Sequence, residues 1–253
     1  MLLLFAAAAA AVAAAPPQTI DLHLCPHSHL DVGFDWTPDT MFSKNLTGPN
    51  QIKGPGRLKS VGVVMDAVVA ALQQDPKRTY NMAEIFYLDL WLTSKVGRPQ
   101  EREALIKLIQ AGQFNFMNGG WCQNDEASIH IDGIIDQHTL GHLFLRSLLG
   151  DFYTPKVGWQ VDPFGHSAGH AWVLYQMGFD TAVTGRIGGR GVQAGNSLWA
   201  PFAENGLAGT ILNNVHGGYS DINPSACTGA SHLMSHVHHP CPLLFARQFV
   251  CVY

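Results

Sequence analysis

The stretch CPHSHLDVGF, residues 25–34, places two histidines and one aspartate at alternate positions, His27, His29 and Asp31. Alternate residues of a β-strand lie on one face, about 6.5 Å apart along it. Imidazole and carboxylate groups both bind zinc, so a His-x-Asp pair at the end of a strand predicts half of a metal site. The spacing leaves a second interpretation equally open, in which backbone hydrogen bonds satisfy a pair of core histidines.

Strand-like and helix-like segments alternate along the sequence around this stretch. The expected strands are residues 19–25, 79–83, 113–117, 156–161 and 181–184, and the expected helices are residues 58–72, 84–91, 99–111, 133–149 and 167–177. Strands that alternate with helices favour a parallel sheet with helical crossovers. The predicted fold class is therefore α/β, with parallel strands alternating with helices in a partial or irregular (β/α) barrel.

The segment GWQVDPFGHS, residues 158–167, places Asp162 directly after an expected strand. Pro163 disfavours the helical conformation for the residue before it, so Asp162 is expected to stay extended. In parallel sheets and barrels, functional side chains gather at the carboxyl ends of the strands. Asp162 is therefore a candidate for a catalytic or metal-binding role, although an aspartate is also common in an ordinary turn.

The segment NGGWCQNDEA, residues 118–127, follows another expected strand. Its two glycines allow close approach of the backbone, and Trp121 offers a flat apolar face that suits a sugar ring. Asp125 and Glu126 are candidates for orienting ligands. The alternative is that both are acidic residues at the N-terminus of the next helix.

The three segments HSHLDVG, NGGWCQNDEA and WQVDPFGHS follow one another in this order, each after an expected strand. Together they closely resemble the N-terminal α/β domain of glycoside hydrolase family 38, the retaining α-mannosidases, and most of all its soluble lysosomal or vacuolar branch. The segments DQHTLGHLFL, residues 136–145, and QMGFDTAVTGR, residues 176–186, are similar to the same family. The resemblance covers about residues 20–190.

The resemblance implies a metal site and a nucleophile. His29 and Asp31 stand where the family places two zinc ligands, and Asp162 stands where it places an aspartate that is both zinc ligand and catalytic nucleophile. His27 is expected to orient one of these ligands from behind. The implied cofactor is one zinc ion, which chelates the cis 2- and 3-hydroxyls of mannose, while Asp162 attacks the anomeric carbon and forms a covalent intermediate.

The resemblance also implies a pocket for the sugar. Phe164 and Arg186 match residues beside the bound mannose, and Phe34 stands where the family usually has tryptophan. Phe34 keeps an apolar wall for the sugar but lacks the indole N–H. The implied partner is a mannose-containing glycan.

The activity that the resemblance implies is hydrolysis of terminal α-mannosyl residues of glycans by a retaining, zinc-dependent α-mannosidase. The family takes a fourth zinc ligand, a histidine, and its general acid/base, an aspartate, from sequence beyond the part matched here. We therefore expect a truncated chain that is weakly active or inactive alone, because general acid assistance contributes about 10²–10⁴-fold to the rate. The alternatives are a non-catalytic, truncated carbohydrate- or metal-binding protein and a related zinc polysaccharide deacetylase.

The N-terminal residues 1–15, MLLLFAAAAAAVAAA, form an apolar run of the length of a signal peptide's hydrophobic region. An Ala-rich helix is the alternative, and the run is shorter than the roughly 20 apolar residues that span a membrane. Asn45-Leu46-Thr47 is a glycosylation sequon and fits a secretory route. The expected location is the secretory pathway, ending in the lysosome, the vacuole or outside the cell, with no membrane span after signal cleavage.

The rest of the chain divides into two parts. Residues 16–190 are the expected α-mannosidase-like α/β domain, and residues 191–253 are a poorly matched, loop-rich tail. We expect the sequence from about residue 228 to be a non-native continuation. We therefore do not expect its histidines to supply a metal ligand; these are His232, His236, His238 and His239. A net charge of −4 and a pI near 6.3 give no basic patch, so nucleic acid is not an expected partner.

Overall fold

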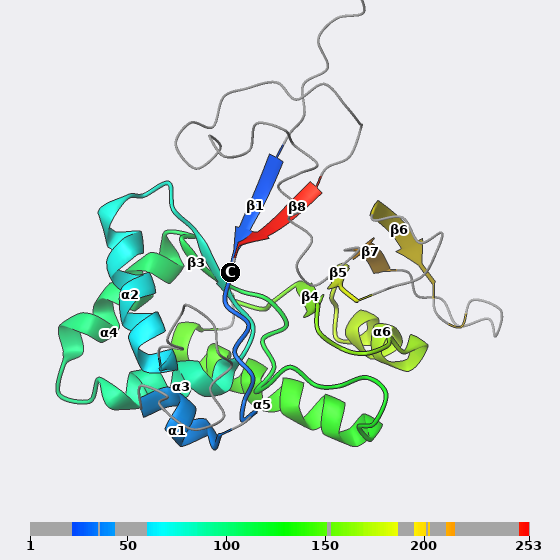
Figure 1. Ribbon diagram of the computed structural model, residues 1–253, viewed down its shortest axis with the longest axis horizontal. Coiled ribbons are helices and arrows are strands. Elements are labelled where there is room, and N and C mark those ends of the chain that lie inside the picture. The colour runs from blue at the N-terminus through cyan, green and yellow to red at the C-terminus, as the bar shows by residue number, and fades with distance from the viewer. Residues whose placement is uncertain are drawn as a thin grey trace, which may run out of the picture.

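The computed structural model describes residues 22–34, 36–43, 60–150, 153–186, 195–200, 202, 211–215 and 248–252. The helices are α1 (Pro38–Ser43), α2 (Val61–Gln74), α3 (Ile85–Ser94), α4 (Pro99–Gln110), α5 (Ile131–Leu149) and α6 (Ala168–Gln176). The strands are β1 (Leu22–Pro26), β2 (Tyr80–Met82), β3 (Phe114–Phe116), β4 (Val157–Gln160), β5 (Thr181–Thr184), β6 (Gly195–Trp199), β7 (Ile211–Val215) and β8 (Gln248–Val252). Figure 1 shows α1 to α4 gathered on one side of the molecule, with α5 running from them toward α6.

Parallel pairing of strands joined by helices is confirmed. β2 pairs with β3, β4 with β5, β5 with β7 and β1 with β8, all parallel, whereas β6 and β7 are antiparallel. Hydrogen-bonded strands among the described residues fall into three sheets, in the orders β1–β8, β2–β3 and β4–β5–β7–β6. Closure into a barrel therefore stays a prediction, and strands β6, β7 and β8 were not predicted from the sequence.

Helix α2 shows why the predicted helices form where they do. Its N-cap is Ser60, whose hydroxyl accepts a hydrogen bond from the Val63 backbone N–H. Val61, Met65, Val69 and Leu72 recur at helical spacing and are buried. Full burial of such a side chain contributes about 1.5–3 kcal/mol. One polar cap and one apolar stripe thus fix both the start of this helix and the face that packs on the core.

The segments that carry functional candidates are tied together by strand-end contacts. His27 forms a bridge to Asn81, which joins the end of β1 to β2. Asn118, directly after β3, is buried and pairs through its side-chain amide with both backbone groups of Trp159 in β4, at 2.7 Å each. These contacts align the carboxyl ends of β1, β2, β3 and β4, where the candidate residues lie.

The predicted signal peptide, residues 1–15, and the sequon at Asn45 lie outside the described residues. No helix in the part of the chain that the structure describes has both the length and the apolar character needed to cross a membrane. The domain boundaries at residues 16, 190 and 253 stay predictions.

Three histidines pack edge to face between α5 and α6. The rings of His142 and His170 each lie 6.1 Å from that of His138, centroid to centroid. Burial lowers the pKa of His138 to about 4 and also lowers the pKa values of His142 and His170. All three are therefore neutral in the folded protein near pH 7.

Acidification is expected to destabilise the fold through His138. Below the ordinary histidine pKa of 6.5 the unfolded chain binds a proton that folded His138, with a pKa of about 4, does not bind. Between pH 7 and pH 5 this difference removes about 2 kcal/mol of stability. The replacement His138→Gln should therefore flatten the fall in the free energy of unfolding over this range, measured by urea denaturation. The control His130→Asn changes an exposed histidine at the N-cap of the same helix, and equal slopes for wild type and His138→Gln would contradict the prediction.

Candidate metal centre

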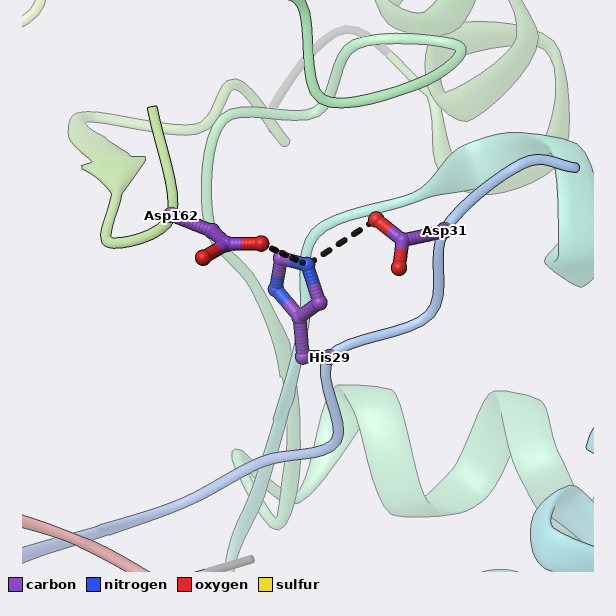
Figure 2. Close-up of side chains that lie close together, drawn as sticks. All are labelled: His29, Asp31 and Asp162. Atoms are coloured by element: carbon purple, nitrogen blue, oxygen red, sulfur yellow. Dashed lines mark hydrogen bonds and ion pairs between the residues drawn. The ribbon is translucent and has the colours of Figure 1, made fainter. Parts of the chain in front are cut away.

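Three side chains from two distant segments meet at the carboxyl ends of β1 and β4. His29 Nε2 lies 3.0 Å from Asp31 Oδ1 and 3.3 Å from Asp162 Oδ2. Figure 2 shows the imidazole of His29 between the two carboxylates, with both dashed lines ending on the same ring nitrogen. One ligand atom from each of the three residues lies within 4.8 Å of the others. The grouping has the donor set and the compactness of a site for one divalent cation.

The backbone after β1 explains how His29 and Asp31 come to face the same way. Leu30, between them, is buried in the core, and its N–H donates to Glu84 Oε1 over 3.4 Å. The carbonyl of Asp31 accepts a hydrogen bond of 2.7 Å from the hydroxyl of Tyr87. The strand β1 ends at Pro26, so His29 and Asp31 come together beyond the strand, on either side of the buried Leu30.

Asp162 is held by an arginine from the neighbouring loop. The guanidinium of Arg186 contacts Asp162 Oδ1 through two of its nitrogens, Nε and Nη2. Arg186 has a left-handed backbone, with φ of 53°, and its guanidinium lies 4.9 Å from the ring centroid of Phe164. The carboxylate of Asp162 therefore has one oxygen on Arg186 and the other directed at His29.

Burial and nearby charge act against each other on the His29 imidazole. Burial lowers its pKa, but the hydrogen bond to Asp31 and the charges of Glu84, Asp31 and Asp162 outweigh this, so the net shift of the pKa is upward. Burial also raises the pKa of Glu84 to about 7, against the opposing charge of His29. A cation bound by His29 would have to displace the ring proton, so metal affinity should fall as the pH falls.

The remaining predicted site residues lie around this group. Phe34 and Phe164 are 73% and 81% exposed, so their rings are available to a ligand in solution. His27 is buried, its Nδ1 lies 3.2 Å from the carbonyl oxygen of Cys25, and its ring packs edge to face on Trp159 at 4.7 Å. The roles of Phe34, Phe164, Arg186 and His27 stay predictions.

Two acidic residues near the site, Glu84 and Glu126, are buried. Glu84 was not predicted, and its one sequence signal is an acidic residue within the otherwise apolar run MAEIFYL, residues 82–88. Glu126, named above as a candidate for orienting ligands, is buried and pairs with His166 at 2.9 Å. Its neighbour Asp125 lies in a turn and accepts hydrogen bonds from the backbone N–H groups of Glu126 and Ala127.

Several known proteins are similar to this chain in sequence, and others are similar in fold. An α-mannosidase of Canavalia ensiformis is 40% identical over 172 residues, and a lysosomal α-mannosidase of Homo sapiens is 38% identical over 171 residues. Each match covers 68% of this chain and 16% of the relative, so the chain spans about one sixth of the length of these proteins. The crystal structure of an α-mannosidase from Enterococcus faecalis V583 superposes with a TM-score of 0.59 at 17% identity, covering 78% of this chain and 20% of that one.

The family model described as "Glycosyl hydrolases family 38 N-terminal domain" matches residues 19–190. These residues include all three members of the cluster of His29, Asp31 and Asp162. The match covers more than half of the chain and agrees with the order of the three motifs in the sequence. The chain therefore belongs to glycosyl hydrolase family 38, a family of α-mannosidases, and its residues 19–190 match the N-terminal domain of that family.

Proposed function

We propose that the chain supplies the zinc site and the nucleophile of a retaining α-mannosidase. The observation that carries the proposal is that His29, Asp31 and Asp162 come together. His29 Nε2 lies 3.0 Å from an oxygen of Asp31 and 3.3 Å from an oxygen of Asp162. The matched relatives are named α-mannosidases, which supports the same conclusion. The proposed substrate is a glycan with terminal α-linked mannose.

The donor set fits zinc. One imidazole nitrogen and two carboxylate oxygens are ordinary zinc ligands, and ligands about 2.1 Å from a tetrahedral ion lie about 3.4 Å from one another. The distances from His29 Nε2 to Asp31 and Asp162 are close to that value. Three protein ligands leave the fourth position open, and catalytic zinc sites can expand to five-coordinate, which would give room for two hydroxyls of a substrate. We therefore assign His29, Asp31 and Asp162 as the residues that would hold the ion.

The proposed mechanism assigns the covalent step to Asp162. Arg186 holds one oxygen of this carboxylate and so fixes its direction. Asp162 attacks the anomeric carbon of the mannoside as the glycosidic bond breaks, and the departing oxygen takes a proton from a general acid and leaves as an alcohol. Water later cleaves the mannosyl ester with net retention. A zinc ion held at this site would chelate the cis 2- and 3-hydroxyls of the sugar and stabilise negative charge.

The aromatic rings complete the proposed pocket. Phe164 lies against the guanidinium of Arg186, on the loop that carries Asp162. Phe34 comes three residues after Asp31 and is exposed. Both rings can cover an apolar face of the sugar. Because several of the matched relatives are named lysosomal enzymes, we also propose that the protein reaches the lysosome or vacuole, or is secreted.

Covalent trapping of the nucleophile tests this function. A 5-fluoro mannosyl fluoride, which keeps the 2- and 3-hydroxyls, forms a slowly hydrolysed ester, and its anomeric fluoride leaves without protonation, so the assay reports on Asp162 and not on a general acid. The zinc-loaded chain should gain one mannosyl group, which peptide mass spectrometry should place on Asp162. The matched glucosyl reagent, with an equatorial 2-hydroxyl, should label far less. Labelling elsewhere, or equal labelling by both sugars, would refute the proposal.

A further inference from the structure

Glu126 is a buried carboxylate whose two oxygens hold one loop at two points. Its side chain is 3% exposed. Oε1 lies 2.9 Å from His166 Nδ1, and Oε2 accepts a hydrogen bond of 2.7 Å from the backbone N–H of Ser167. Both partners belong to the loop between β4 and α6, residues 161–167, which carries Asp162. A residue from the segment after β3 therefore anchors the far end of the loop that carries Asp162.

The His166 ring extends this contact to the loop after β5. Its Nε2 donates to the carbonyl oxygen of Gly185 over 2.7 Å. Because a carbonyl and a carboxylate both accept hydrogen bonds, the ring donates from both nitrogens and is an imidazolium. Burial lowers the pKa of His166, but the hydrogen bonds to Glu126 and Gly185 outweigh it, and the net shift of the pKa is upward. The His166 imidazolium and the Glu126 carboxylate therefore form a charge-assisted hydrogen bond.

The two loops that His166 joins are those that carry Asp162 and Arg186. Gly185 directly precedes Arg186, and its N–H donates to the carbonyl oxygen of Gln160 in β4 over 2.9 Å. At the other end, the guanidinium of Arg186 contacts Asp162. Two contacts therefore join the loop after β4 to the loop after β5. One is the contact between Asp162 and Arg186, and the other is the hydrogen bond from His166, which Glu126 holds, to Gly185.

We propose that Glu126 is a positioning residue for the metal centre: through Ser167 and His166 it fixes the loop that directs Asp162 at His29. This inference rests on the proposed function, because it takes Asp162 to be a metal ligand. Outer partners that orient a ligand typically contribute about 10- to 100-fold to metal affinity. Because Glu126 acts through backbone and through His166, its removal should lower zinc affinity by about tenfold.

The experiment compares Glu126→Ala, Glu126→Gln and the control Asp125→Ala in the full chain. In Glu126→Ala, the Ser167 N–H and His166 Nδ1 lose the carboxylate that accepts their hydrogen bonds. Glutamine keeps both contacts, since its amide oxygen accepts from Ser167 and its amide N–H donates to a neutral His166 ring. Asp125 is the adjacent acid, and among the described residues its carboxylate accepts hydrogen bonds from its own turn, residues 126–128. Zinc affinity is measured by competition with a chelator, and the geometry of the site by the visible spectrum of the cobalt-substituted protein.

The expected result is a loss of about tenfold in zinc affinity and a changed cobalt spectrum for Glu126→Ala, with near wild-type values for Glu126→Gln and Asp125→Ala. A folded Glu126→Ala with wild-type affinity and spectrum would overturn the positioning role, whatever its melting temperature. If Glu126→Ala does not fold, Glu126→Asp decides in the same way, because its shorter carboxylate cannot reach both partners. A wild-type chain that binds no zinc would overturn the proposed function itself, and the positioning role with it.

Discussion

Replacing Asp162 with asparagine is expected to weaken zinc binding by about 100-fold and to abolish the trapped mannosyl ester. The amide is neutral and a poor metal ligand, so it removes one of three protein donors and the attraction of a charge. It also leaves the guanidinium of Arg186 facing a neutral group in place of its carboxylate partner. Affinity is measured by chelator competition on the purified chain, and the ester by mass spectrometry.

A matched control separates this effect from the loss of any surface charge. Asp180, next to the start of β5, is exposed, and Asp180→Asn makes the same chemical change outside the cluster. We expect this control to keep wild-type zinc affinity. Equal affinity in Asp162→Asn and wild type would mean that Asp162 does not bind the metal, and the proposed chemistry would then lose its nucleophile as well as its ligand.

Replacing Gly141 with alanine is expected to destabilise the fold by about 3 kcal/mol, because an added methyl group overpacks a tight contact. Gly141 lies in α5, where a Cβ would meet the carbonyl oxygen of Gly119 and come within 2.7 Å of Gly120 C and 2.9 Å of Trp121 N. All three neighbours are backbone atoms, so the helix would have to move away from the NGGW segment. The free energy of unfolding in urea measures the effect.

Replacing Gly133 in the same helix with alanine is expected to have the opposite effect on stability. A Cβ there would touch only the flexible side chain of Ile129, at 3.4 Å. Alanine at this position should therefore stabilise the helix by up to about 1 kcal/mol, the ordinary difference in helix propensity. A Gly141→Ala protein as stable as Gly133→Ala would show that α5 does not pack against the NGGW segment as closely as described.

The sequence predicted the parts of the site that local patterns specify. The alternation around Leu30 gave the common face of His29 and Asp31, and the strand before Pro163 gave the position of Asp162. The meeting of these segments came from the family resemblance, because no local pattern says which strand ends are neighbours. The helices were predicted for a similar reason. The start of α2 is marked by the Ser60 cap and that of α4 by Pro99, and each helix carries its apolar stripe within its own sequence.

Other features depend on contacts between distant segments and could not be predicted. β6 and β7 pair with each other, and β8 pairs with β1, so their strand character comes from a partner as well as from their own composition. Glu126 and His166 are 40 residues apart, and neither segment alone shows that the acid is buried or that the ring donates at both ends. Glu84 was missed because its burial beside Leu30 follows from the packing of the segment after β1 against the start of α3.

Anomalous diffraction at the zinc absorption edge, from crystals of the zinc-loaded chain, tests the central claim most directly. We expect one anomalous peak within bonding distance of His29 Nε2 and of a carboxylate oxygen from each of Asp31 and Asp162. Zinc bound elsewhere, for example in the histidine-rich segment 232–239, with these three side chains unligated, would contradict the account.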